Sequence, residues 1–276
     1  MSQLSRMLGI SRQAAYQAIA RWQRRVAEEE MALALLRAER QRHPHMGIRK
    51  IYVKIQPILR AWGIKMGRDR LFRLAREHGL LAPIRRNPRR TTHPGWRRFP
   101  NLLAEAMLTG PGQALVADIT YIFTERGHRY LFVVMDAYSR YLVGWALSGS
   151  LGVEGALAAL AMALQGPGPL QAGCIHHSDH GVQYTARAYQ EALQQAGLRP
   201  SMGQVGNAYD NALAERVIGT LKNEYGIEGP FVDQKQAREV IEEAIYLYNH
   251  DRPHWSLGLV TPYEVHVMSE AGKIKV

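Results

Sequence analysis

The sequence contains a single cysteine, Cys174, among its 276 residues. One cysteine excludes an intramolecular disulfide framework and a zinc site built from several thiolates. No stretch reaches the roughly 20 apolar residues that a membrane-spanning helix needs. The first residues, MSQLSRMLGISRQ, lack the apolar run of a secretory signal. These absences predict a reducing, cytoplasmic setting and no membrane contact.

Charge is divided unevenly along the chain. Residues 1–110 contain 23 lysines and arginines against 7 aspartates and glutamates, whereas residues 111–276 contain 12 against 17. Because most of these basic residues are arginines, which are good phosphate partners, the first part is predicted to bind a polyanion. The alternative is a charge excess that only keeps the protein soluble. With 46% hydrophobic residues, the chain is predicted to be globular.

Residues 2–27 show the pattern of two helices around a tight turn. Gly9 suits the end of the first helix, and Ser11 suits the N-cap of the second, which continues as a charged helix through residues 28–42. We interpret this pattern as a helix-turn-helix, with an ordinary helical hairpin as the alternative. Three polar residues lie outside the apolar face of the second helix and are candidate DNA contacts: Arg12, Gln13 and Gln17.

A second helical module runs from Ile48 to about Leu80, where Gly79 suits the final stop. Its later part alternates an apolar face with arginines, and Arg68 and Arg70 are candidate DNA contacts. A basic segment rich in proline then interrupts regular structure. Its arginines occur in three pairs that can follow the phosphates of a nucleic acid: Arg85 and Arg86, Arg89 and Arg90, Arg97 and Arg98.

From residue 111 the pattern becomes that of a mixed α/β sheet. Three apolar runs separated by short turns predict an antiparallel meander: 114–123, 130–136 and 141–147. Short strands then alternate with helices: strands at 173–177 and 198–202, helices at about 153–165, 186–196, 209–225 and 234–250. The predicted domains are a helix-turn-helix with its extension (1–42), a second such module (43–82), a basic linker (83–110), a catalytic core (111–265) and a tail (266–276).

Three acidic residues stand out within this core. Asp118 lies in the middle of an apolar strand, Asp179 lies just beyond the fourth strand, and Glu215 lies on a long helix. Carboxylates that converge repel one another, and divalent cations are the natural compensation. Two cations about 3.5–4 Å apart can hold the attacking and leaving oxygens of a phosphoryl displacement. Oxygen ligands and a phosphate substrate favour two ions of Mg²⁺ or Mn²⁺.

The spacing of these acids raises their significance. Thirty-five residues separate Asp179 from Glu215, and Lys222 follows Glu215 by seven residues, two turns along the same helix face. This pattern resembles the signature of the integrase-type transposases of the Insertion Sequence Three family, and more distantly that of retroviral integrases. Flanking motifs are also similar to those of the family: QALVADIT around Asp118, DAYSR from Asp136, HSDHGVQY around Asp179, GNAYDN before Glu215, and YNHDRPH from Tyr248.

The resemblance covers roughly residues 43–265. It implies a ribonuclease H-like fold for the core, catalysis and metal binding by Asp118, Asp179 and Glu215, and strand cleavage and strand transfer at the ends of an insertion sequence. It also implies that Lys222 meets the phosphate beside the attacked bond, and that residues 44–80 form the preceding helix-turn-helix. The implied partners are double-stranded DNA, both terminal repeats and target, a homodimer or higher oligomer on DNA, and, in two-frame elements, an upstream-frame protein.

Other polar residues leave alternatives open. Asp136 is interpreted as holding the turn before Ser139, and His176 and His177 as hydrogen-bonding neighbours and not metal ligands. Asn211 lies one turn before Glu215 and is a candidate substrate contact. For Arg252, DNA contact and bracing of the domain are both open.

Two other functions fit the same residues. A metal-dependent nuclease would hydrolyse DNA without joining ends, and a domesticated regulator would only bind DNA. The intact acidic triad with Lys222 argues against the regulator.

Overall fold

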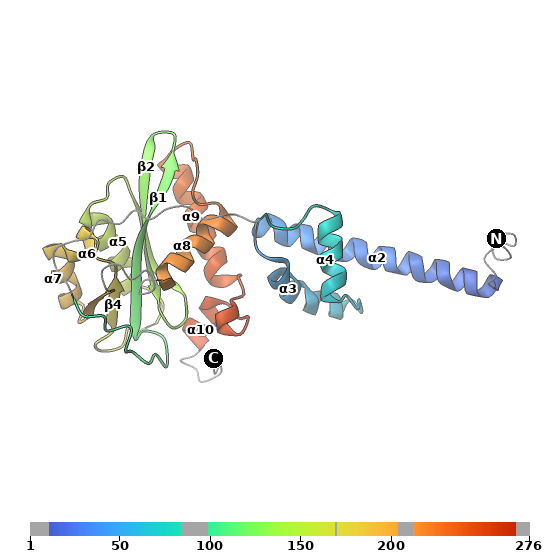
Figure 1. Cartoon of the computed structure of the whole chain (residues 1–276), viewed down its shortest axis with the longest axis horizontal. Coiled ribbons are helices and arrows are strands. Elements are labelled where there is room, and N and C mark those ends of the chain that lie inside the picture. Colours follow the sequence, from blue (N-terminus) through green and yellow to red (C-terminus); the bar gives the residue numbers. More distant parts are fainter. Residues whose placement is uncertain (1–10, 84–98, 169, 204–211, 269–276) are drawn as a thin grey trace. The chain divides into compact units, whose positions relative to one another are not determined.

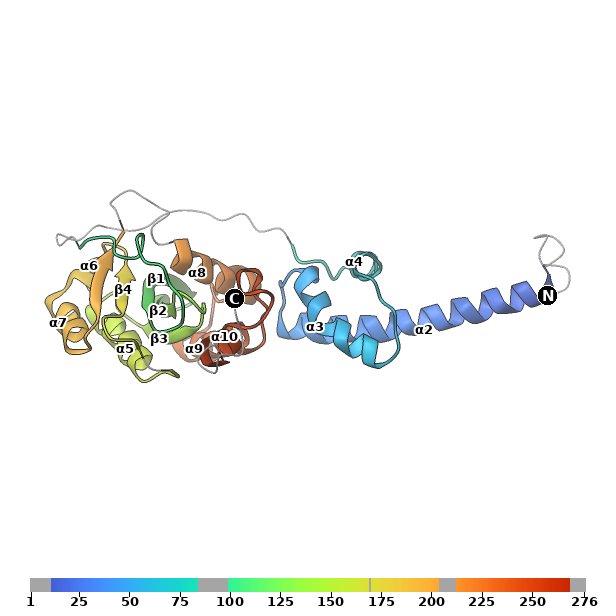
Figure 2. The same ribbon diagram turned by 90° about the horizontal axis from the view of Figure 1, so that it is seen from below.

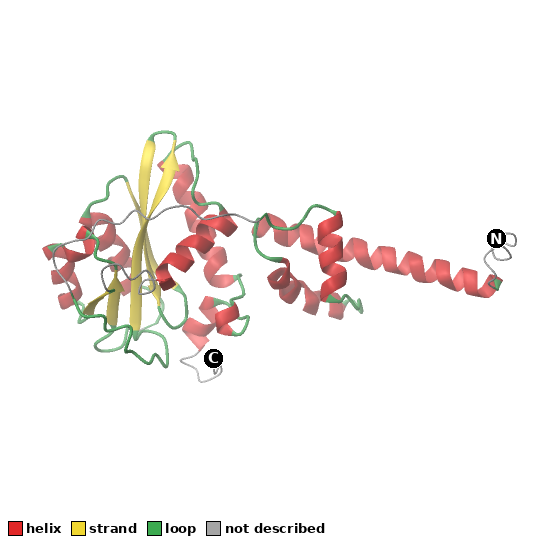
Figure 3. Ribbon diagram, in the orientation of Figure 1, coloured by secondary structure: helices red, strands yellow, loops and turns green. Residues whose placement is uncertain are grey.

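The computed structural model describes residues 11–83, 99–168, 170–203 and 212–268. It divides the chain into an N-terminal unit of residues 1–84 and a C-terminal unit of residues 85–276. In the described residues the N-terminal unit is entirely helical, and the strands belong to the C-terminal unit (Figure 3). None of the helices in these described ranges is both long and apolar enough to cross a membrane.

The N-terminal unit begins its described part with one long helix, α2 (Arg12–Arg42). The Ser11 hydroxyl accepts a hydrogen bond from the Ala14 amide at 3.1 Å, which confirms Ser11 as the N-cap. The predicted second helix and its charged extension form this single element. The first helix of the predicted helix-turn-helix lies in residues 1–10, outside the described residues.

Two shorter helices, α3 (Ile48–Ala61) and α4 (Arg68–Glu77), pack against the second half of α2. Leu36 of α2 is fully buried in the same core as Ile55 of α3 and Leu71 of α4. The predicted boundary between residues 42 and 43 therefore falls inside one hydrophobic core. The reason is that α2 has too little apolar surface to fold by itself and completes its core with α3 and α4.

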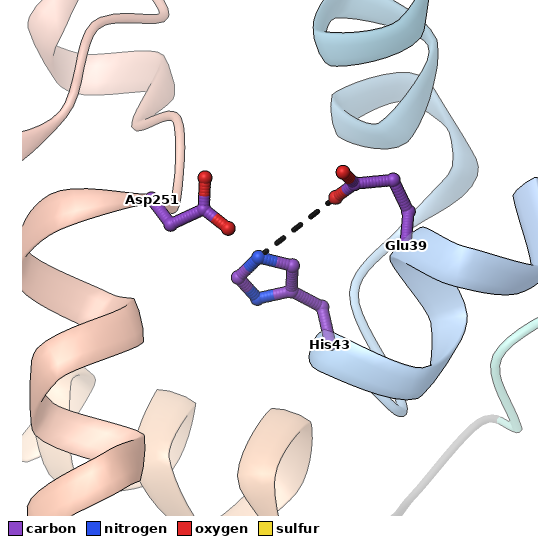
Figure 4. A group of neighbouring side chains, drawn as sticks. All are labelled: Glu39, His43 and Asp251. Carbon is purple, nitrogen blue, oxygen red and sulfur yellow. Dashed lines mark ion pairs between the residues drawn. The ribbon is translucent and has the colours of Figure 1, made fainter. Parts of the chain in front are cut away.

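Polar side chains near the end of α2 bind the segments that follow it. The Arg40 guanidinium donates to the backbone carbonyls of Met46 and Leu80, both at 2.8 Å. On the same helix, the Glu39 carboxylate lies 4.0 Å from the buried His43 ring (Figure 4) and 2.6 Å from the Lys54 ammonium of α3. These contacts join α2 to α3 and to the segment after α4.

The C-terminal unit is built on one five-stranded sheet in the order β3-β2-β1-β4-β5. The β1–β2 and β2–β3 pairs are antiparallel, and the β1–β4 and β4–β5 pairs are parallel. The strands are β1 (Ala114–Thr124), β2 (Gly127–Asp136), β3 (Leu142–Ser148), β4 (Ile175–Ser178) and β5 (Arg199–Met202). The predicted meander followed by alternating strands and helices is confirmed.

Helices cover both faces of this sheet (Figures 1 and 2). On one face, α5 (Val153–Leu164), α6 (Val182–Thr185) and α7 (Arg187–Gln195) pack over alternate residues of the strands. On the other face lie α8 (Ala212–Tyr225) and α9 (Gln234–His250). The remaining elements are a 3₁₀ turn, η1 (Trp255–Leu257), and α10 (Pro262–Met268). The α/β fold, with two helix layers around a mixed sheet, is the one expected for a ribonuclease H-like core.

Folded residues extend past both predicted ends of the core. Residues 99–110 were expected in the linker, but Phe99 and Leu102 pack against the two sheet faces, and the Leu102 amide donates to the Ser201 hydroxyl at 2.9 Å. The tail was expected from residue 266, yet His266 lies within α10, is buried, and lies 2.9 Å from the Ser139 hydroxyl. Apolar side chains at both ends extend the folded unit.

Candidate active site

The sheet register brings the first two acids to the same level. Val116 of β1 pairs with His177 of β4 in a parallel ladder. Two residues further along each strand direction are Asp118 and Asp179, and Asp179 lies directly beyond the end of β4. Because neighbouring strands lie about 4.8 Å apart, the two carboxylates are neighbours across the β1–β4 pair. The parallel pairing of β1 with β4 thus places side by side two residues that are 61 positions apart in the sequence.

Alternation along β1 decides which face carries Asp118. Val116 and Ile122 belong to the core under α8, so Asp118, at the same parity, points to the α8 side. Helix α8 packs on β1 through a buried stripe: Ala214, Val217, Ile218 and Leu221. Glu215 and Lys222 lie beside this stripe, Glu215 exposed and Lys222 half-buried. The third acid and the lysine therefore reach the same sheet face as Asp118.

The charges of Asp179, Glu215 and Lys222 all act on the carboxyl group of Asp118. Burial, together with the negative charges of Asp179 and Glu215, raises the pKa of Asp118 from 3.8 to about 8. A hydrogen bond from the Ile119 amide at 2.8 Å and the charge of Lys222 act in the opposite direction. Burial lowers the pKa of Lys222, against the opposing effect of Glu228 and Asp118. Three carboxylates with one partly buried ammonium leave this site short of positive charge.

The segment after β4 fixes the orientation of Asp179. Its carboxylate accepts a hydrogen bond from the Gly181 amide at 2.9 Å, and a Cβ added to Gly181 would lie 3.0 Å from the same oxygen. Tyr184 of α6 is almost fully buried, and its pKa is raised by burial, by Tyr189 and by the two aspartates. Tyr184 is packed in the core on the α5 face of the sheet, and the charges of both aspartates act on it, a position that reading the sequence missed. Its place in the HSDHGVQY motif was the available signal.

The acids and imidazoles nearby are structural. The Asp136 carboxylate accepts hydrogen bonds from the Gly112, Tyr138 and Ser139 amides and from the Ser139 hydroxyl. Its side chain lies on the opposite sheet face, because it pairs with Leu115 and not with a residue of the Asp118 parity. His176 lies 2.9 Å from the Tyr189 hydroxyl and His177 lies 2.9 Å from the Ser201 hydroxyl. The hydrogen-bonding interpretation of all three residues is confirmed.

Two of the candidate DNA contacts are engaged inside their own units. The Arg70 guanidinium contacts Glu28 at 3.2 Å, Glu29 at 2.9 Å and the Arg25 carbonyl at 3.1 Å, so it ties α4 to α2. Arg252 is only 5% exposed and pairs with both Glu224 oxygens at 2.7 Å. These partners come from distant segments, and for Arg252 they favour bracing over DNA contact.

The other candidates are distributed differently. Four of them are exposed on the N-terminal unit: Arg12, Gln13, Gln17 and Arg68. The remaining seven lie outside the described residues: Arg85, Arg86, Arg89, Arg90, Arg97, Arg98 and Asn211. Of the candidates that lie in the described residues, these four are exposed on the N-terminal unit, and Lys222 is the one beside the acidic residues.

Comparisons with known proteins agree with this geometry. Two models described as integrase core domain match residues 109–208 and 196–262. A 31 kDa protein of insertion element IS600 from Shigella sonnei is 40% identical over 224 residues, which cover 79% of this chain and 82% of that protein. A putative transposase for insertion sequence element IS986/IS6110 from Mycobacterium tuberculosis is 34% identical over 227 residues, covering 79% and 80%.

Among solved structures, the HTLV-2 integrase catalytic core domain in complex with magnesium is similar with a TM-score of 0.46. It is 17% identical, and the similarity covers 57% of this chain and 97% of that domain.

Proposed function

The chain belongs to the Insertion Sequence Three family of integrase-type transposases, and on this premise we propose that Asp118, Asp179 and Glu215 catalyse strand cleavage and strand transfer at insertion-sequence ends. The observation that carries the proposal is the convergence of the three carboxylates on one sheet face, where Asp179 and Glu215 both act on the pKa of Asp118.

The donor set fits divalent cations. Asp118 holds its proton up to about pH 8 in the absence of a compensating charge, so a cation that replaces the proton is favoured. Carboxylate oxygens suit Mg²⁺ or Mn²⁺, and we propose two ions, with Asp118 shared and Asp179 and Glu215 each completing one site. When bound, the ions would activate the nucleophilic oxygen of water or a DNA 3′-hydroxyl and stabilise the departing 3′ oxygen.

The chain's own residues supply positioning. Lys222 lies within electrostatic range of Asp118 and is half-buried, so its ammonium can hold the phosphate beside the attacked bond. Neither the acidic triad nor Lys222 is a nucleophile of the serine or cysteine type, so we propose direct displacement without a covalent protein intermediate.

The N-terminal unit is proposed to hold double-stranded DNA, both terminal repeats and target. Residues 1–84 carry 17 basic against 6 acidic residues, and exposed Arg12, Gln13, Gln17 and Arg68 lie on its helices. Because two element ends must be joined, the active form is proposed to be a dimer or larger on DNA, with an upstream-frame protein as a further partner. We place the protein in the bacterial cytoplasm, on the nucleoid.

Labelled duplexes carrying candidate element ends test the proposal, with purified protein and Mg²⁺ or Mn²⁺. We expect nicked and joined products that disappear in Asp118→Asn, Asp179→Asn and Glu215→Gln, while DNA binding remains. Glu191→Gln is the matched control, because this exposed acid pairs with Arg187 on α7, away from the triad. If Asp118→Asn still cleaved DNA, the proposal would be contradicted. If the wild type nicked DNA without forming joined product, the alternative of a hydrolytic nuclease would be favoured.

A further inference from the structure

The loop that carries Asp179 contains a buried histidine. His180 follows Asp179 directly and is only 9% exposed. Its Nε2 atom lies 2.5 Å from the backbone carbonyl oxygen of Gly203. Because a carbonyl oxygen can only accept a hydrogen bond, the Nε2 atom carries the proton and donates it. The ring therefore links the loop after β4 to the residue that follows β5.

Gly203 contacts the residues on both sides of Asp179. Ser178 of β4 pairs with Met202 of β5 in a parallel register. Asp179 and Gly203 are the next residues along these two strands. The Gly203 amide donates to the Ser178 carbonyl at 3.4 Å, and the Gly203 carbonyl accepts from the His180 ring. One residue thus holds the backbone of Asp179 from its preceding and its following neighbour.

The other ring nitrogen of His180 makes no comparable contact. With the proton on Nε2, the Nδ1 atom of a neutral ring is an acceptor. This atom is buried and has no hydrogen-bond partner among the residues that the structure describes. Burial of a polar atom without a partner costs free energy. Within the described residues, the bond to Gly203 is therefore the contact in which the role of this imidazole lies.

We propose that His180 is a positioning residue, which holds Asp179 where this acid takes part in metal binding. The Asp179 carboxylate accepts a hydrogen bond from the Gly181 amide at 2.9 Å, so its orientation follows that of the loop. Groups that fix a metal-binding carboxylate change metal affinity or activity by about 10- to 100-fold. The inference rests on the proposed function and adds to it a residue that acts through Asp179.

The test replaces His180 in the full chain and measures Mn²⁺ binding directly, from the electron paramagnetic resonance signal of free Mn²⁺. His180→Leu removes the donor, whereas His180→Gln keeps an N–H donor near the position of Nε2. We expect His180→Leu to raise the Kd for Mn²⁺ about tenfold, and His180→Gln to stay within about twofold of the wild type. Cleavage of the labelled duplex at limiting Mn²⁺ should fall in the same order, with little change in the KM for DNA.

His266→Leu is the matched control. The buried His266 ring likewise donates from Nε2 to a backbone carbonyl, that of Pro167, at 2.7 Å. Its loss should lower the melting temperature of the metal-free protein and leave the Kd for Mn²⁺ unchanged. The comparison separates the loss of a buried hydrogen bond from the loss of a metal-binding geometry.

The outcomes distinguish the inference from the proposed function. If His180→Leu lowers the melting temperature but binds Mn²⁺ like the wild type, His180 is only structural and the inference is overturned. If His180→Leu does not fold, His180→Asn replaces it, because the shorter amide does not reach Gly203; wild-type Mn²⁺ affinity in that variant would equally overturn the inference. If the wild type binds Mn²⁺ no better than Asp118→Asn, the proposed function itself fails, and the inference fails with it.

Discussion

At Asp118, folding and the proposed metal binding make opposite demands on one carboxyl group. Burial and two neighbouring acids raise its pKa from 3.8 to about 8 in the folded protein, whereas the unfolded chain titrates near 3.8. Between these values the folded state holds a proton that the unfolded state has released. The free energy of unfolding contributed by this group is therefore greatest below about pH 4, falls as the pH rises, and is fully lost above about pH 8.

Asp118→Asn is expected to stabilise the metal-free protein at high pH, because the neutral amide has no charge to bury. Each pKa unit corresponds to about 1.4 kcal/mol, and after discounting for the partial exposure of the group we expect a gain on the order of 1–3 kcal/mol near pH 8 and little below pH 4. Urea unfolding with a chelator present measures this difference. The exposed Asp69→Asn variant is the control, and an equal difference at both pH values would contradict the assignment.

Arg252→Ala should destabilise the C-terminal unit by about 3–5 kcal/mol, because Glu224 would be left with a largely buried, unpaired charge. Thermal or urea unfolding measures the loss. Replacing both partners, as in Arg252→Met with Glu224→Leu, should recover most of it. If Arg252→Ala left stability unchanged and weakened only DNA binding, the bracing role would be wrong.

Residues differed in how far their roles could be predicted. Asp118 and Asp179 could be found because a carboxylate inside an apolar strand, and another at a strand end, leave a local signal. Arg70 and Arg252 could not be assigned, because their partners Glu29 and Glu224 are distant in sequence and nothing local distinguishes a paired arginine from a free one. Tyr184 was missed because a buried tyrosine gives the same pattern as any core aromatic.

At the scale of elements, the long periodic segments were predicted closely. The strand predicted at 114–123 is found at Ala114–Thr124, and the helix predicted at 234–250 is found at Gln234–His250. The seven-residue α10 was missed, because its pattern covers only two turns. Residues 99–110 contain too few periodic residues to distinguish a linker from a segment that packs irregularly on the sheet.

Close packing of α5 on β3 depends on Gly144. A Cβ at this position would lie 2.2 Å from the Ala159 carbonyl oxygen and 2.7 Å from the Ala163 nitrogen. Gly144→Ala should therefore cost about 1–3 kcal/mol or more, measured by urea unfolding. Gly219→Ala on α8 is the matched control. An added Cβ there would lie 3.9 Å from the Asn223 side chain, and alanine should increase the free energy of unfolding by up to about 1 kcal/mol. Equal effects of both substitutions would exclude the proposed close contact.

At the scale of the whole molecule, the chain folds around separate cores. The core of the N-terminal unit contains Leu36, whereas the C-terminal unit has a core on each sheet face. Because no hydrophobic cluster is shared between the units in the described residues, we expect two calorimetric transitions. Leu36→Ala should lower only the Tm of the N-terminal unit, because it reduces the free energy of unfolding of that unit by about 2–5 kcal/mol. Gly144→Ala should lower only the Tm of the C-terminal unit. A single transition that shifts with both variants would contradict this division.

The parallel register of β1 and β4 also constrains how such a chain can change over time. Asp118 and Asp179 meet because of where each stands on its own strand, and the hairpin, helix and loops between them only return the chain to the sheet. Insertions or deletions in the loops that join these elements leave the two aspartates side by side. A single residue gained or lost between Ala114 and Asp118 would instead turn the carboxylate to the α5 face. Lineages of this protein should therefore vary freely in loop length while the few positions before each aspartate keep a fixed count.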